Sequence, residues 1–121
     1  MTQNAEPHAI QGAPSYIELG VEDADRARAF YGALFGWRMN GAAGPGQAST
    51  GGLNIGIHDH DPSSLLEVFF TVNDLDSAIA KVAALGGRIV GDIHAESAEF
   101  GRWVECDDDQ GVRFGLRQPA G

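Results

Sequence analysis

The stretch that decides the fold is YIELGVEDADRARAFYGALFGW, from Tyr16 to Trp37. Its first residues alternate between apolar and other side chains, which is typical of a strand with one face under a helix. Asp23 follows where a helix N-cap belongs, apolar residues then recur at helical spacing, and Gly36 provides a C-terminal stop. The stretch therefore predicts a strand, a capped helix and a turn into a second strand.

A second stretch of the same pattern, EVFFTVNDLDSAIAKVAALGGR, runs from Glu67 to Arg88. At an offset of 51 residues it repeats eight residues of the first stretch identically, among them the aspartate that caps each helix. A repeat of about half the chain length determines the architecture. We expect an α+β fold of two tandem βαβββ modules, residues 14–60 and 64–118, after a flexible leader of residues 1–13.

The individual elements follow from alternation, helical spacing and turn residues. In the first module we expect strands over residues 15–21, 37–40, 47–50 and 52–58, with a helix after Asp23. In the second module we expect a strand from Glu67, a helix after Asp74, and strands over residues 88–90, 100–107 and 112–117. Between the modules, HDHDPSS (58–64) is interpreted as a solvated linker, although His58 and His60 are residue types that bind metals.

The composition is that of a soluble globular domain, with 121 residues, 43% apolar residues and a net charge of −9. This acidity makes a nucleic acid or an anionic membrane an unfavourable partner. The single cysteine, Cys106, excludes an internal disulfide and fits a reducing compartment. No apolar run approaches the roughly 18 residues of a membrane span, and the N-terminus lacks the pattern of a secretory signal. These features predict a cytoplasmic protein.

Beyond the repeat, the chain resembles the vicinal oxygen chelate superfamily, which includes glyoxalases, bleomycin-resistance proteins and extradiol dioxygenases. The resemblance lies in the opening signature, in FTVNDLDSAIAKVAALGG (70–87) and in FGRWVECDDDQGVRFGL (100–116). The last of these looks most like a glyoxalase-like branch, in which a proline usually stands at the position of Asp109. The resemblance implies a curved mixed sheet around a central cavity, and a homodimer.

The resemblance also implies four positions for a divalent metal, two in each module. In this sequence they are occupied by Tyr16 and Gly56 in the first module and by Glu67 and Gly115 in the second. Glycine has no side chain to bind a metal, and a neutral tyrosine with a pKa near ~10 is a poor ligand at pH 7. Of the four, Glu67 alone is a competent donor. We therefore expect no cofactor and no metal site of the family's kind.

Alternation along the strands predicts which side chains face the cavity, provided that Val104 and Cys106 point into the core. Aromatic walls with a few directed polar groups are typical of small-molecule pockets. Two carboxylates in an apolar cavity would suit acid–base chemistry, although these charges could also pair with one another or face a dimer partner. The candidate residues are Tyr16, Glu18, Asn54, His58, Glu67, Phe69, Thr71, Trp103, Glu105, Arg113 and Arg117.

Three functions are compatible with this pattern. The first is a metal-free protein that binds a small organic molecule, like the drug-binding branch of the superfamily. The second is a lyase or isomerase resembling lactoylglutathione lyase, with Glu67 or His58 as the catalytic group. The third is a non-catalytic module that interacts through sheet edges or helices of a dimer. We favour the first.

Overall fold

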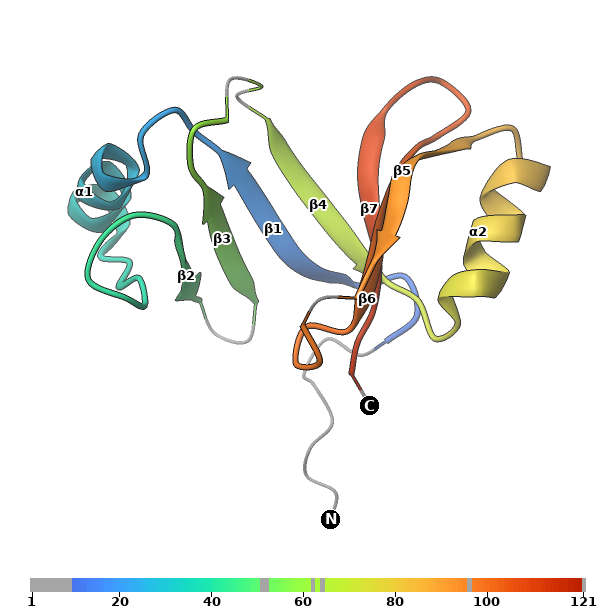
Figure 1. Cartoon of the computed structure of the whole chain (residues 1–121), viewed down its shortest axis with the longest axis horizontal. Helices are drawn as coiled ribbons and strands as arrows, with labels where there is room; N and C mark the ends of the chain where they lie inside the picture. The colour runs from blue at the N-terminus through green and yellow to red at the C-terminus, as the bar shows by residue number, and fades with distance from the viewer. Residues whose placement is uncertain (1–9, 51–52, 62, 64, 96, 121) are drawn as a thin grey trace, which may run out of the picture. The chain divides into compact units, whose positions relative to one another are not determined.

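The computed structural model describes residues 10–50, 53–61, 63, 65–95 and 97–120. Within these residues the chain forms two helices and seven strands in mixed parallel and antiparallel pairing, which confirms the α+β class. The chain divides into two compact units. The first module is Tyr16–Glu67, and the second module is Val68–Gly121 together with Met1–Ser15. Figure 1 shows the helices and strands of both modules.

The elements in chain order are β1 (Pro14–Gly20), α1 (Ala24–Phe35), β2 (Gly46–Ser49), β3 (Asn54–His58), β4 (Leu66–Thr71), α2 (Leu75–Ala84), β5 (Arg88–His94), β6 (Arg102–Asp107) and β7 (Arg113–Gln118). No helix in the described part of the chain is long and apolar enough to cross a membrane.

In the first module, β3 lies between β1, its parallel neighbour, and β2, its antiparallel neighbour. The side chain of Asp23 accepts a hydrogen bond from the backbone N–H of Arg26 at 3.1 Å, so α1 begins at the predicted cap. Helix α1 covers one face of the sheet, where its small residues allow close packing. The core there consists of Leu19, Ala24, Ala27, Ile55 and Ile57.

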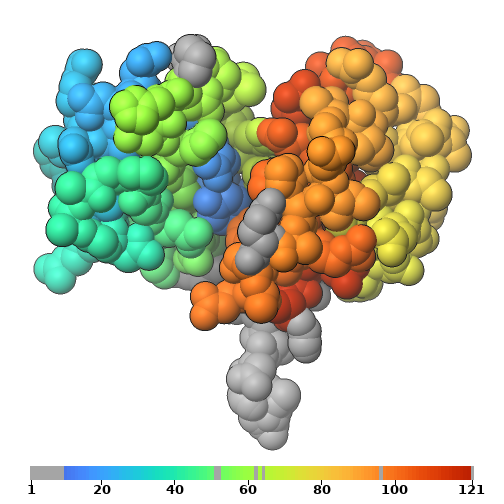
Figure 2. All heavy atoms as spheres, in the orientation of Figure 1, coloured from blue at the N-terminus to red at the C-terminus, as the bar shows by residue number. Residues whose placement is uncertain are grey.

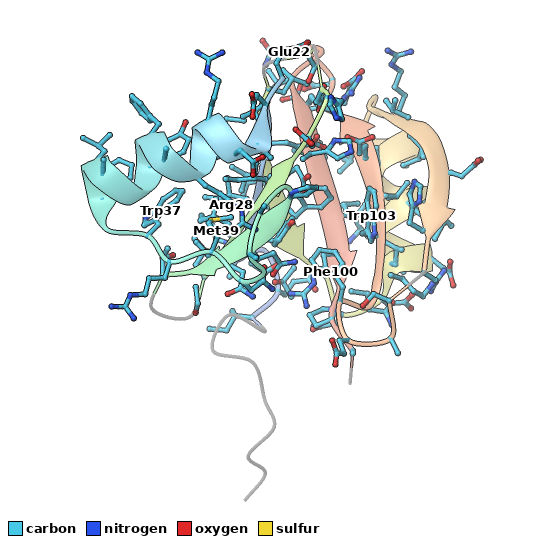
Figure 3. The ribbon with its side chains drawn as sticks, turned by 60° about the vertical axis from the view of Figure 1, so that its left-hand side comes forward. Glu22, Arg28, Trp37, Met39, Phe100 and Trp103 are labelled. Carbon is cyan, nitrogen blue, oxygen red and sulfur yellow. The ribbon has the colours of Figure 1, made fainter. Side chains whose placement is uncertain are left out.

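The predicted strand over residues 37–40 is wrong, because this segment makes only one isolated bridge, from Met39 to Ala48. The cause is Arg28 of α1, whose guanidinium donates hydrogen bonds to a ring of backbone carbonyls in the following loop. Its acceptors are Asn40, Gly41, Ala43, Gly44 and Pro45, with the shortest bond 2.6 Å long. A loop wrapped around one guanidinium cannot extend along β2. Figure 3 labels Arg28 and Met39 in this region.

In the second module, β7 pairs in parallel with β4 and antiparallel with β6, and β6 pairs antiparallel with β5. Asp74 caps α2 by accepting from the backbone N–H of Ser77 at 3.2 Å. Helix α2 packs against β5, β6 and β7, and Figure 2 shows its atoms beside those of β5. The residues buried beneath the helix are Val72, Leu75, Val104, Cys106 and Leu116, so Val104 and Cys106 do point into the core.

Three boundaries in the second module differ from the expected ones. Gly12 and Ala13, expected to belong to the leader, hydrogen-bond to β4: Gly12 N–H donates to the Thr71 carbonyl, and Thr71 N–H to the Ala13 carbonyl, both at 2.8 Å. Residues 1–9 of the expected leader lie outside the described residues. Strand β5 continues to His94 through an irregularity after Val90. Strand β6 starts at Arg102 instead of residue 100, because Gly101 turns the chain with a φ of +93°.

The duplication extends to a second cap on each helix. The N–H of Ala24 donates to the Asp59 carboxylate at 2.7 Å, and the N–H of Leu75 donates to the Gln118 side-chain oxygen, also at 2.7 Å. Asp59 and Gln118 follow or end the last strand of their modules, so they are equivalent positions. Asp59, which was expected to be part of a solvated linker, therefore caps the start of α1.

Candidate ligand-binding faces

Each module has a sheet face opposite its helix, called here the helix-free face. Because the core residues alternate with it along each strand, its members follow from the strand register. In the first module these members are Tyr16, Glu18, Asn54, Gly56 and His58, and in the second they are Phe69, Thr71, Trp103, Glu105, Arg113, Gly115 and Arg117. These are the predicted residues of each module together with the two glycines at the metal positions. Glu67 alternates with Phe69 and Thr71 along β4 and therefore lies on the same side of that strand.

On the first helix-free face, Tyr16 lies over Gly56. The tyrosine is buried, with 8% of its surface exposed, and its hydroxyl donates a 2.8 Å hydrogen bond to the Glu18 carboxylate. A Cβ atom at Gly56 would overlap the Tyr16 hydroxyl. The missing side chain therefore provides the space in which the Tyr16–Glu18 pair sits.

The other predicted residues of the first module have different surroundings. Asn54 is exposed and donates to the Gln47 side chain at 3.3 Å. His58 is 65% exposed and its Nδ1 lies 3.2 Å from the Asp61 carboxylate. Hydrogen bonds from Ser63, and then from His58, hold the pKa of Asp61 below its usual value of 3.8. Glu67, at the end of the first module, is buried, with 6% of its surface exposed.

The second helix-free face is built from rows of residues that face one another across four strands. One row contains Thr71, Arg117, Trp103 and His94, and the next contains Phe69, Gly115, Glu105 and Val90. The Phe69 ring lies over Gly115, where a Cβ atom would overlap it. This arrangement matches that of Tyr16 over Gly56, so each module covers its last-strand glycine with an aromatic side chain.

Four rings and one cation form the centre of this face. We call Phe69, His94, Phe100 and Trp103 the aromatic wall. The His94 and Trp103 rings stack with their centroids 4.0 Å apart, and Phe69 meets Trp103 edge-on at 5.5 Å. The Arg117 guanidinium lies 4.3 Å above the Phe100 ring, while its Nε donates to the Phe100 carbonyl at 2.8 Å. Arg117 is 6% exposed, so a buried positive charge stands beside the wall.

Sequence reasoning missed two members of the wall, Phe100 and His94. The expected strand over residues 100–107 would have placed Phe100 on the same side as Val104. Instead the turn at Gly101 precedes the strand and directs Phe100 toward Arg117. Figure 3 labels Phe100 and Trp103 near the start of β6. His94 was missed because β5 was expected to end at Val90. In the structure β5 continues, and His94 pairs with Trp103 of β6.

A third row on this face is ionic. Asp107 lies between Arg88 and Arg113 on the neighbouring strands. Its carboxylate accepts from Arg113 Nε at 2.6 Å and from Arg88 Nε at 3.1 Å. These bonds, with that from Arg113 contributing most, hold the pKa of Asp107 below its usual value of 3.8. Arg113 is thus part of an ion-pair row. Alternation from Trp103 and Glu105 would have predicted Asp107 on this face.

The ionised form of Asp107 is expected to stabilise the fold in a defined pH range. Because its pKa is lower in the folded chain than in the unfolded chain, the stabilisation is complete above the unfolded value near 3.8. It is lost as the pH falls through the lower, folded value. Asp107→Asn should therefore lower the free energy of unfolding at pH 6, and the difference from wild type should shrink below pH 4. Urea unfolding across this range measures it.

The matched control is Asp92→Asn, since Asp92 is an exposed aspartate on β5. That variant should follow the wild-type curve at every pH. A constant gap between Asp107→Asn and wild type from pH 6 to pH 2.5 would contradict an ionic role for Asp107.

The residues at the superfamily's metal positions do not fit a divalent ion. In the first module the side of Gly56 is covered by the Tyr16 hydroxyl, and in the second the side of Gly115 is covered by the apolar Phe69 ring. Glu67 supplies one carboxylate, whereas such sites need several imidazole or carboxylate donors. No group of three histidine, cysteine or acidic residues in the described ranges is placed to hold a metal.

Comparison with known proteins gave matches to a family model and to curated relatives. Residues 16–44 match the model described as bleomycin resistance protein-like N-terminal. The "Putative glyoxylase CFP32" of Mycobacterium bovis is 33% identical over 123 aligned positions, and so is the protein of that name from Mycobacterium tuberculosis. Each alignment covers 90% of this chain and 45% of the relative. The chain thus spans about half the length of the curated relatives it matches.

Solved structures share the fold. A Streptomyces coelicolor methylmalonyl-CoA epimerase in complex with 2-nitronate-propionyl-CoA matches with a TM-score of 0.65 and 18% identity, over 93% of this chain and 100% of that one. The methylmalonyl-CoA epimerase of Mycobacterium tuberculosis gives 0.69 and 19%, over 100% and 94%. The hypothetical protein BH1468 from Bacillus halodurans gives 0.72 and 12%, over 93% and 97%. At these identities the likeness concerns the fold alone.

Proposed function

Since the chain belongs to the vicinal oxygen chelate superfamily, to which the family model and the curated relatives point, we propose that it binds a small organic molecule on the helix-free face of its second module, without the superfamily's metal. The observation that carries this proposal is the aromatic covering of Gly56 and Gly115. A catalytic relative would project ligands from these positions, whereas here they support aromatic rings.

The chemistry of the second helix-free face indicates a planar or apolar ligand. The aromatic wall offers ring surfaces, and Trp103 and Phe100 are only partly buried. The Arg117 charge and the Glu105 carboxylate lie in the adjacent strands, where they would orient polar groups of a ligand. Such a mixture of rings and a few directed polar groups is typical of small-molecule sites.

The proposal is tested by ligand titration and metal analysis of protein purified without chelator or affinity tag. Trp37→Phe leaves Trp103 as the only tryptophan, so quenching reports on the aromatic wall. A bound aromatic compound at one hundred times its Kd should raise the Tm by about 10 °C.

Phe100→Ala should weaken binding of this compound by roughly two- to tenfold. Phe30→Ala, which removes an exposed ring on α1, should leave the affinity unchanged. Stoichiometric divalent metal in the purified protein would refute the metal-free function.

A second candidate function is that of an acid–base enzyme of the isomerase or lyase type, with Glu67 as the general base. The burial of Glu67 favours it, since a carboxylate shielded from water suits proton abstraction. The structural neighbours include epimerases, and the curated relatives carry a glyoxylase name. Turnover of a hemithioacetal or of a 2-substituted acyl thioester that is lost in Glu67→Gln, with ligand binding retained, would establish this function. No turnover in either assay would exclude both versions.

A further inference from the structure

A groove of about 320 Å³ lies in the second module between α2 and β7, on the face opposite the aromatic wall. Its floor is apolar, and polar groups stand along its rim. The lining residues that matter here are Ala78, Val82, Leu85, Phe114, Leu116 and Lys81. No family position and no residue of the proposed ligand site lies among them.

The helical wall of the groove follows from the spacing of α2 and its flanking residues. Its members recur at intervals of three and four residues, which places them on one helix face: Asp74, Ser77, Ala78, Lys81, Val82 and Leu85. Sequence periodicity predicts Leu85 as part of the buried stripe, yet it is 70% exposed. The Leu85 side chain therefore lines the groove but does not fill it.

The duplicated module explains why the groove is open. The residue of α1 equivalent to Val82 is Tyr31, whose ring packs against the first core and stacks on Trp37 at 5.1 Å. Valine in the same helical position is several atoms smaller, so the space between helix and sheet is left unfilled in the second module. Val82→Tyr would place the first module's own side chain there.

Lys81 is the only lysine in the sequence. It is exposed on the rim of the groove. Among the described lysine and arginine residues of the second module it alone makes no ion pair or hydrogen bond, whereas Arg88, Arg102, Arg113 and Arg117 are all engaged. An uncompensated cation beside an apolar groove complements an apolar chain that ends in an anion.

We propose that this groove is a second small-molecule site, which takes an amphiphile with an apolar chain and a carboxylate head. The chain lies between α2 and β7 against Val82 and Phe114, and the carboxylate pairs with Lys81. This site is independent of the ligand proposed for the aromatic wall.

The probes are octanoate and octan-1-ol, which share a chain and differ in head-group charge. Reductive methylation labels Lys81 and, besides it, only the terminal amine, so one methyl resonance reports on the groove. Octanoate should shift this resonance saturably and bind about fivefold more tightly than octan-1-ol, a difference of about 1 kcal/mol. Lys81→Gln and Lys81→Arg lack the label, so calorimetry measures their affinities. Lys81→Gln should abolish this preference without weakening octan-1-ol binding, and Lys81→Arg should retain it.

Two further variants test the location. Val82→Tyr should abolish binding of both probes, and Leu85→Glu should weaken octanoate about fivefold with little effect on octan-1-ol. Ala83→Glu is the matched control, because Ala83 is exposed at the end of the same helix but does not line the groove. If Val82→Tyr unfolds the chain, Leu85→Glu alone decides.

Three results would overturn the proposal. Octanoate affinity could be unchanged by Leu85→Glu, or it could be lost on Phe100→Ala, which would place the probe on the aromatic wall. Alternatively, sedimentation could show a dimer that Leu85→Glu dissociates, in which case a second copy of the chain occupies the groove. Octanoate affinity that is unchanged in Phe100→Ala and about fivefold weaker in Leu85→Glu separates this site from the proposed function.

Discussion

Gly115→Ala is expected to lower the free energy of unfolding by about 1–3 kcal/mol, the cost of forcing an extra carbon into a packed site. The added Cβ would overlap the Phe69 ring, which is 4% exposed and in contact with Trp103. The ring cannot move away without breaking its edge-on contacts with Trp103 and Phe100. Urea unfolding monitored by circular dichroism measures the change.

A double-mutant cycle identifies the cause. Phe69→Ala alone should cost roughly 3–5 kcal/mol, because it removes a buried ring. In that background Gly115→Ala should be neutral or stabilising, since its steric partner is gone and alanine restricts the unfolded chain. Gly32→Ala is the matched control: it lies in α1, where the nearest atom to a new Cβ is the Trp37 carbonyl oxygen at 3.5 Å. It should stabilise by about 0.5–1 kcal/mol. Additive effects at Phe69 and Gly115 would contradict this interpretation.

Gly101→Ala is expected to lower the free energy of unfolding by about 2–5 kcal/mol and also to weaken ligand binding at the aromatic wall. At a φ of +93° a side chain costs about 1–2 kcal/mol. The new Cβ would in addition overlap the Gln118 carbonyl oxygen and lie 2.9 Å from the Ala120 nitrogen. Because these obstacles are backbone atoms, the turn itself must shift, and Phe100 must leave its place over Arg117.

Gly111→Ala separates the cost of the positive φ from the cost of the overlap with backbone atoms. Gly111 has a similar φ of +87°, but nothing lies within 4 Å of a Cβ there. This variant should therefore cost only the backbone part, about 1–2 kcal/mol, and leave ligand affinity unchanged. Urea unfolding and quenching of Trp103 in the Trp37→Phe background provide the two readouts. Equal destabilisation by the two variants would show that φ alone matters at Gly101.

Much of this fold can be predicted from the sequence because its signals are local. Asp23 and Asp74 cap their helices as expected, since a capping aspartate needs only the backbone N–H groups of the next turn. Period-two alternation places Val104 and Cys106 in the core and leaves Trp103 and Glu105 on the other face. The duplication could be recognised in the sequence for the same reason, because both copies keep the aspartate that caps the helix.

The errors arose where distant residues override local preference. The expected strand over residues 37–40 gave way to a loop held by Arg28, twelve or more positions earlier in the chain. The expected leader contributes Gly12 and Ala13 to pairing with Thr71. In both cases the partner lies far away in sequence, so neither propensity nor periodicity within the segment carries the information.

The Tyr16-to-Trp37 stretch alone determined the strand and the capped helix, and its resemblance to the superfamily implied that Tyr16 occupies a position where a catalytic relative would hold a metal. The tertiary structure decided what Tyr16 does there: it lies over Gly56 and donates to Glu18. The tertiary structure also decided that Arg117 lies over the Phe100 ring and that Val82 and Lys81 line a groove. The physical reason is that alternation and capping depend on neighbours along the chain, whereas rows across a sheet and unfilled volume depend on strand register and side-chain size.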